Sequence, residues 1–207
     1  GATFTQVVAT NPTVGDSGNQ LYVSPTGNDA VTRANNSTTN PWRTITHALY
    51  NLQAGDTLNI RSGTYVPAYP IVLHSDYRSR TDRTRGGDPN EIMNAQTGTV
   101  SQPVTVRAYP GDPKGSVVID AAGKTTLINL DNKSYWTFDG LKIINTSRAF
   151  WVGEDVTSTN NTFQNLDITM STGGDNHGGI TLNGFTTENT KIHNNKIIGP
   201  GTGVGIH

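Results

Sequence analysis

Hydrophobic and polar residues alternate in this chain over stretches of only four or five residues, and turn residues separate these stretches. Residues 57–60, for example, alternate between a turn at Gly55 and another at Gly63. Residues 21–23 show the same short pattern before a segment rich in Pro, Gly, Asn and Asp. Alternation with a period of two predicts β-strands, and these turn residues predict the ends of the strands. The pattern therefore predicts an all-β fold built from many short strands.

One segment departs from this alternation. Ile45, Ala48, Leu49 and Leu52 follow one another at the i, i+3, i+4 and i+7 positions of a helix, and Thr44 precedes them as a plausible N-cap. We therefore expect one short amphipathic helix over residues 44–52.

The second half of the chain contains a degenerate repeat. The segments F-D-G-L-K-I, F-Q-N-L-D-I and I-H-N-N-K-I begin at residues 138, 163 and 192, which are 25 and 29 residues apart. A second set, A-F-W-V, G-I-T-L and G-V-G-I, runs in step with them and begins at residues 149, 179 and 203. Internal periods of this length are typical of solenoids.

Short strands that return at this spacing predict a parallel β-helix, in which each strand pairs with its equivalent one coil away and inward side chains form columns. The predicted columns are Phe138, Phe163 and Ile192, and Ile143, Ile168 and Ile197; the predicted shared tight turn is Gly140, Asn165 and Asn194. A β-sandwich is the alternative, but it does not explain why the same residue types return once per coil.

The predicted organisation is an extended lead-in over residues 1–20 and a β-helix domain over residues 21–207. Within that domain, residues 44–52 form a helix that caps the N-terminal end, residues 76–99 form a loop insertion, and residues 103–207 form the regular coils. The last segment, G-T-G-V-G-I-H, stops within a strand pattern. We therefore expect either a fragment of a longer, open-ended solenoid or end-to-end self-association with another subunit.

Composition narrows the classes of partner. Fifteen basic and 16 acidic residues give a net charge of -1, so there is no overall field to attract nucleic acid or an anionic membrane. The absence of Cys excludes disulfides and thiol catalysis. No apolar run is long enough to span a membrane.

Four motifs in the first half resemble a known group of proteins. In order they are L-Y-V-S-P-T-G-N-D-A, N-P-W-R-T-I-T-H-A-L, A-G-D-T-L-N-I-R-S-G-T-Y, and P-V-T-V-R-A-Y-P-G-D with V-V-I-D soon after. This series resembles the opening of extracellular right-handed parallel β-helix proteins, a group that includes polysaccharide lyases acting on pectate, alginate and chondroitin-type uronic acid polymers. The resemblance covers residues 21–207 and also extends to β-helix proteins without known catalysis.

The resemblance implies an extracellular location and a substrate groove on one parallel sheet. It further implies a Lys or Arg as catalytic base and a Ca²⁺ ion, held by acidic residues, that neutralises the uronate carboxylate. If residues 179–182 belong to the groove sheet, alternation points Thr181 outward, with Trp151 at the equivalent position one coil earlier and Asn183 at the end of the strand. These three residues are candidates for sugar binding, with Trp151 as an aromatic surface on which a sugar ring would stack. The alternative is that Trp151 points into the core.

The turn before that strand, residues 171–178, brings Asp175, Asn176 and His177 together as candidates for sugar binding or, for His177, catalysis. His207, which ends the next strand, is the other catalytic candidate. The alternative for the turn is an ordinary solvated loop.

Glu154 and Asp155 follow the preceding groove strand, and with Asp175 they would approach one Ca²⁺ across adjacent coils, which lie about 4.8 Å apart.

A second basic candidate lies in the loop insertion, where Arg78, Arg80, Arg83 and Arg85 would bind an acidic polysaccharide. Acidic residues in the same stretch support the alternative of a self-paired surface loop. No Lys or Arg is expected on the outward positions of the groove strands. The catalytic base is therefore expected beyond His207, or the protein does not catalyse elimination.

These observations favour a polysaccharide lyase-like protein that performs β-elimination on an acidic polysaccharide. The alternative is a non-catalytic surface or fibre-forming β-helix protein that assembles end to end. A β-helical glycoside hydrolase or esterase would need paired carboxylates or an activated nucleophile, and the sequence locates neither.

Overall fold

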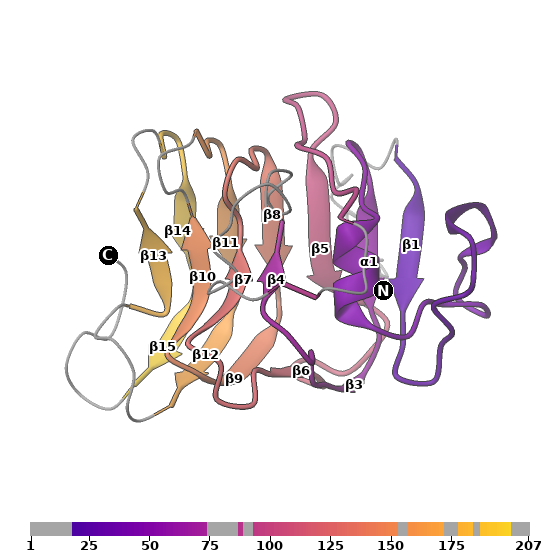
Figure 1. The fold of residues 1–207 in the computed structure, drawn as a ribbon, viewed down its shortest axis with the longest axis horizontal. Helices are drawn as coiled ribbons and strands as arrows, with labels where there is room; N and C mark the ends of the chain where they lie inside the picture. Colours follow the sequence, from indigo (N-terminus) through magenta and orange to yellow (C-terminus); the bar gives the residue numbers. More distant parts are fainter. Residues whose placement is uncertain are drawn as a thin grey trace, which may run out of the picture.

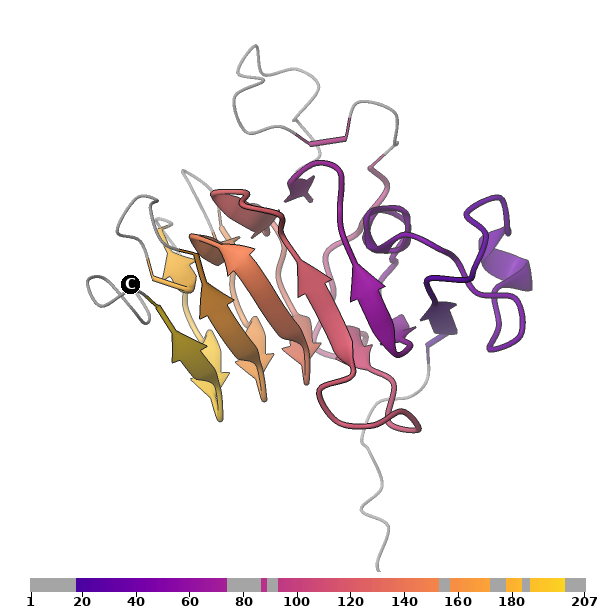
Figure 2. The same cartoon turned by 90° about the horizontal axis from the view of Figure 1, so that it is seen from below.

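The structure, a computed structural model, describes residues 18–73, 87–88, 93–152, 157–171, 178–183 and 187–199. In these residues, short parallel strands form three sheets that enclose one hydrophobic interior (Figures 1 and 2). No helix within the described ranges is long and apolar enough to cross a membrane.

The six-stranded sheet has the order β1 (Gln20–Val23), β2 (Thr57–Ile60), β5 (Val104–Ala108), β8 (Trp136–Asp139), β11 (Thr162–Gln164) and β14 (Lys191–His193). The five-stranded sheet has the order β3 (Gly63–Tyr65), β6 (Val117–Asp120), β9 (Lys142–Thr146), β12 (Asp167–Met170) and β15 (Lys196–Ile198). The four-stranded sheet has the order β4 (Ile71–Val72), β7 (Thr126–Asn129), β10 (Arg148–Val152) and β13 (Ile180–Leu182).

From β2 onward the chain visits the six-, five- and four-stranded sheets in turn, and each strand pairs in parallel with its equivalent in the next coil. The predicted parallel β-helix is therefore confirmed. Parallel pairing already begins with β1 and β2. In the sequence, by contrast, the repeat could be recognised only from residue 103 onward.

Both predicted columns are present in the register. Phe138 pairs with Phe163, which pairs with Ile192. The Ile143, Ile168 and Ile197 column is equally continuous. Gly140, Asn165 and Asn194 have φ angles of 71°, 56° and 57°, so the predicted tight turn recurs in a left-handed conformation that Gly and Asn tolerate.

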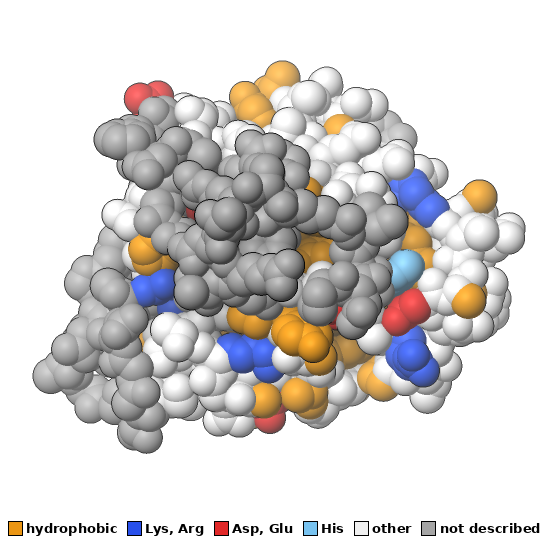
Figure 3. Space-filling view, viewed as in Figure 1, with side chains coloured by type: hydrophobic (Ala, Val, Ile, Leu, Met, Phe, Trp, Pro, Cys, Tyr) orange, Lys and Arg blue, Asp and Glu red, His pale blue; other side chains and the backbone are white. Residues whose placement is uncertain are grey.

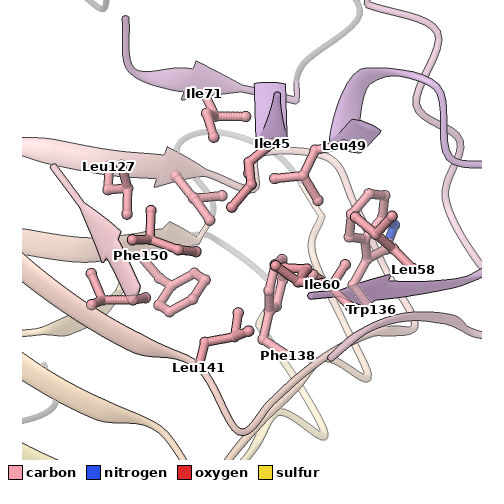
Figure 4. Close-up of a cluster of buried hydrophobic side chains, with 14 of the residues drawn as sticks. Ile45, Leu49, Leu58, Ile60, Ile71, Leu127, Trp136, Phe138, Leu141 and Phe150 are labelled. Carbon is pink, nitrogen blue, oxygen red and sulfur yellow. The ribbon is translucent and has the colours of Figure 1, made fainter. Parts of the chain in front are cut away.

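Aromatic rings fill the middle of the interior. Phe138 stacks on Phe163 with ring centroids 5.7 Å apart, and Phe150 of the four-stranded sheet lies 4.8 Å from each of them. Figure 4 shows Phe138 and Phe150 entering this space from different sheets. Phe138, Phe163, Ile143 and Ile168 are buried completely, and Ile192 and Ile197 of the last described coil are partly buried. Burial of this apolar surface stabilises each coil against its neighbours.

The predicted helix is α1 (Ile45–Tyr50), somewhat shorter than residues 44–52. Thr44 caps it, since its side chain accepts a hydrogen bond from the His47 backbone N–H at 3.2 Å. In Figures 1 and 2, α1 lies beyond β4 toward the N-terminal end of the solenoid. Figure 4 shows Ile45 and Leu49 pointing into the same interior as the strands.

One lysine is buried in the turn between β7 and β8. Lys133 is 5% exposed, and its Nζ donates a hydrogen bond to the Ala95 carbonyl oxygen at 2.8 Å. Burial lowers the pKa of Lys133 from its usual 10.5 to about 8, because the charged form loses its hydration.

This lowered pKa predicts a pH dependence of stability. Between pH 8 and 10.5 the unfolded state binds more protons at Lys133 than the folded state does, so the free energy of unfolding rises with pH across that window. We expect the wild type to gain roughly 3 kcal/mol relative to Lys133→Met between about pH 7 and pH 10.5. Chemical denaturation of both proteins measures this difference. A difference that stays constant across the window would contradict the burial of this charge.

Candidate functional site

The strands predicted to form the groove, β10 and β13, are neighbours in the four-stranded sheet. Phe150 pairs with Ile180 and Trp151 pairs with Thr181, which is the expected register. Phe150 and Ile180 are fully buried in the interior, whereas Trp151 is partly exposed. Trp151 therefore lies on the outer face, and the alternative in which it points into the core is excluded.

Trp151 lies against the side chain of an arginine. The guanidinium carbon of Arg148 is 4.1 Å from the centroid of the Trp151 ring system, and its Nη1 donates a hydrogen bond to Thr126 Oγ1 at 3.0 Å. Only 7% of Arg148 is exposed. Stacking on an aromatic face orients a guanidinium while its N–H donors point in the plane of the group, where they bind planar carboxylates well.

These side chains border a pocket of about 380 Å³ on the outer face, which we call the basic pocket. Its lining residues are Pro70, Lys124, Thr125, Thr126, Asn129, Arg148 and Trp151. Of these lining residues, which are those that the structure describes, two are cationic and none is acidic. On this face of the molecule, Figure 3 shows basic side chains next to hydrophobic ones. A pocket with this lining suits an anionic group joined to a ring that stacks on an aromatic surface.

From the sequence, no Lys or Arg is expected at the outward strand positions, and in the described residues Trp151 and Thr181 hold those positions. Arg148 and Lys124 nevertheless line the pocket, from positions that the sequence prediction did not consider. Strict alternation places Arg148 on the inner side, because it lies two residues before the buried Phe150. In the structure, however, Ala149 and Phe150 are both fully buried, and their backbone N–H groups both donate to the Gly179 carbonyl oxygen, at 2.9 and 3.1 Å. This local break in alternation brings Arg148 to the same face as Trp151.

Lys124 reaches the basic pocket from the turn before β7, which alternation in the strands cannot reveal. Its Nζ donates a hydrogen bond to the Ala121 carbonyl oxygen at 3.1 Å. This contact anchors the ammonium group to the turn that precedes β7.

Two predicted sugar-binding residues lie on β13 and at its end. Thr181 is only 4% exposed, and its hydroxyl donates a hydrogen bond to the Gly178 carbonyl oxygen at 3.2 Å. Asn183 is exposed, and its backbone N–H continues the ladder to Val152. Asn183 is thus the more accessible of the two, while a binding role for either stays a prediction.

The sequence prediction also missed a carboxylate at the end of β7. Asp131 is 5% exposed. Asn129, Trp151 and Thr181 share one register position. Asp131, two residues after Asn129, therefore occupies the position that Asn183 occupies after Thr181. Its backbone N–H donates a hydrogen bond to the Asn129 side-chain oxygen at 2.9 Å. An acidic group therefore lies beyond the strand end, outside the lining of the basic pocket.

The remaining candidates lie outside the described residues and stay predictions. They are His177 and His207 for catalysis, Asp175 and Asn176 for sugar binding, Glu154, Asp155 and Asp175 for Ca²⁺, and the loop residues Arg78, Arg80, Arg83 and Arg85. The part of the chain that the structure describes contains no group of three or more His, Cys, Asp or Glu side chains placed to hold a metal ion.

Two curated proteins are similar in sequence. The uncharacterized protein YwoF of Bacillus subtilis (strain 168) is 32% identical over 130 residues, covering 61% of this chain and 22% of the relative. The pectate lyase PEL9 of Emericella nidulans is 23% identical over 188 residues, covering 84% of this chain and 38% of the relative. The chain thus spans well under half the length of these relatives.

Two solved structures share the fold. A rhamnogalacturonan lyase matches with a TM-score of 0.57 and 16% identity, covering 91% of this chain and 45% of that one. The pectate lyase Pel9A matches with a TM-score of 0.53 and 16% identity, covering 87% of this chain and 48% of that one. The family model described as the Pel9A-like, right-handed beta helix region matches residues 21–198. The chain therefore belongs to the Pel9A-like right-handed β-helix family.

Proposed function

We propose that the basic pocket binds uronate units of an acidic polysaccharide, as part of an extracellular lyase that cleaves the polymer by β-elimination. The observation that carries this proposal is the lining that the described residues give the pocket: two cationic side chains, one partly exposed tryptophan and, among those residues, no acidic side chain. The names of the pectate lyase relative and of the two lyase structures support the same class of substrate.

The pocket provides two kinds of contact for such a polymer. The Trp151 ring offers an apolar surface to a pyranose ring. Arg148 and Lys124 attract the carboxylate of the sugar, and a guanidinium fork matches the two carboxylate oxygens. Arg148 is largely buried and already oriented by Thr126 and Trp151, so little side-chain entropy is lost when it binds.

These contacts would also favour elimination. Pairing the carboxylate with cations makes the adjacent C–H bond more acidic, and a base then removes that proton. The electron pair of the C–H bond forms the new C=C bond, while the glycosidic C–O bond breaks and its electrons leave with the departing sugar oxygen, which takes up a proton. His177 and His207 remain the candidates for the base.

Calcium is a separate part of the proposal. Glu154, Asp155 and Asp175 would hold the ion, whose charge would further neutralise the uronate carboxylate. Since these residues lie outside the described ranges, the contacts that support the proposal are those of Arg148, Lys124 and Trp151.

An elimination assay tests the proposed activity. The chain is mixed with polygalacturonate, alginate or chondroitin, with Ca²⁺ or with a chelator, and the ultraviolet absorbance of the unsaturated product is followed. We expect product from one of these polymers, and loss of product with chelator if calcium takes part. A polymer that binds to the folded chain but yields no unsaturated product under any condition would contradict the lyase activity. End-to-end assembly stays a prediction of the sequence, which sedimentation analysis would test.

A further inference from the structure

A second pocket, of about 440 Å³, lies at the N-terminal end of the solenoid. It is bordered by the loop after β1, the start of α1 and the chain that leaves β3, and we call it the cap pocket. Its lining includes Asp29, Arg43, Thr46, Thr64, Ala68 and Asp88. The proposed function does not use it.

The charges that line the cap pocket differ from those of the basic pocket. Among the residues that the structure describes, two carboxylates and one guanidinium line the cap pocket, whereas two cations and no carboxylate line the basic pocket. Asp29 is held rigidly, because its Oδ1 accepts hydrogen bonds from the backbone N–H groups of Arg43 and Thr44, at 2.7 and 3.0 Å, and its Oδ2 accepts one from the Thr44 hydroxyl, at 2.8 Å. A uronate in this pocket would face two like charges, which disfavours its binding.

The same lining suits an uncharged sugar. Sugar hydroxyls both donate and accept hydrogen bonds, so they can pair with carboxylates, with a guanidinium and with threonine hydroxyls at once. Thr64 is exposed at an outward position of β3, and Arg43 is exposed two residues before α1 begins. Pro25 and Val66, which are both exposed, add apolar surface for the carbon side of a sugar ring.

The two pockets are neighbours along the chain. The segment 66–70 connects β3 to β4 in Figure 1, with residues 66–68 lining the cap pocket and Pro70 lining the basic pocket. Tyr69, between them, is 40% exposed. An exposed tyrosine at this position offers a stacking surface to a sugar chain that passes from one pocket to the other.

We propose that the cap pocket binds a neutral sugar unit of the same polysaccharide whose uronate units occupy the basic pocket. This inference rests on the proposed function for the identity of the polymer. It predicts that a polymer carrying neutral sugars beside its uronates binds more tightly than a pure polyuronate. The charge of the basic pocket alone would not produce this preference.

Calorimetric titration of the folded chain tests this inference with two kinds of probe. One is tetragalacturonate; the other is the same oligosaccharide extended by a neutral hexose at one end or at the other. The variant Ala68→Trp fills the cap pocket from an exposed position, and Val100→Trp places the same ring at a site that is 84% exposed and lines neither pocket.

One extended probe is expected to bind about tenfold more tightly than tetragalacturonate. Ala68→Trp should abolish that gain without changing the affinity for tetragalacturonate, and Val100→Trp should leave both affinities unchanged. Equal affinities for all probes, or a gain that survives Ala68→Trp, would overturn the cap pocket while leaving the basic pocket supported. Failure of every probe to bind would overturn both proposals.

Discussion

Replacing Phe138 by Ala is expected to lower the free energy of unfolding by about 3–5 kcal/mol, the range found when a buried aromatic ring is removed from a core. Phe138 is fully buried at the centre of the aromatic stack and contacts rings from its own sheet and from the four-stranded sheet. Alanine would leave a cavity between consecutive coils. Since domains of ordinary stability unfold at a cost of about 5–15 kcal/mol, this loss is a large share of the total.

Thr137→Ala is the matched control for Phe138→Ala. Thr137 is the neighbouring residue on β8, but it faces outward and is only partly buried. Its replacement should change the free energy of unfolding by no more than about 0.5 kcal/mol. Chemical denaturation followed by circular dichroism compares the two variants. Similar small losses for both would show that Phe138 is not part of a close-packed column.

Arg148→Leu is expected to weaken the binding of oligogalacturonate by about 10- to 100-fold. A hydrogen bond to a charged group is worth about 1.5–3 kcal/mol, and leucine removes both the charge and the donors. Arg148→Lys keeps the charge but loses the planar fork and the stacking on Trp151, so its affinity should fall between those of the wild type and the leucine variant. Calorimetric titration measures all three affinities.

Arg107→Leu controls for the loss of one positive charge. Arg107 lies at an outward position of β5, on the six-stranded sheet, and its Nε donates a hydrogen bond to Asn59 Oδ1 at 2.9 Å. It lines neither pocket. We expect this variant to bind oligogalacturonate within about twofold of the wild type at moderate salt, where distant charges are screened. Equal losses for Arg107→Leu and Arg148→Leu would point to a general charge effect and against a specific pocket.

The interior of the solenoid could be predicted because its coils repeat. Phe138, Phe163 and Ile192 return at coil spacing, and parallel pairing places equivalent residues in one column. The left-handed turn was readable for the same reason, since Gly and Asn recur at one position of the coil. The start of α1 was readable from Thr44 and the helical spacing of apolar residues after it.

The basic pocket could not be predicted in the same way. Arg148 reaches the outer face only because two consecutive residues, Ala149 and Phe150, both turn inward, and alternation does not reveal that break. Lys124 comes from a turn, where no strand period applies. Contacts between distant segments were equally hidden: Arg33 forms an ion pair with the buried Asp56, 23 residues away, and Lys133 reaches a carbonyl 38 residues away.

Tryptophan fluorescence during titration with oligogalacturonate tests most directly whether the outer face of the four-stranded sheet is the binding surface. Of the three tryptophans in the chain, Trp42 and Trp136 are buried at 1% and 0% exposure, and Trp151 alone is partly exposed and lines the basic pocket. We predict a saturable change in emission that disappears in Trp151→Phe. Oligogalacturonate binding, detected by calorimetry, that leaves the emission of Trp151 unchanged would place the polysaccharide elsewhere and contradict the proposed site.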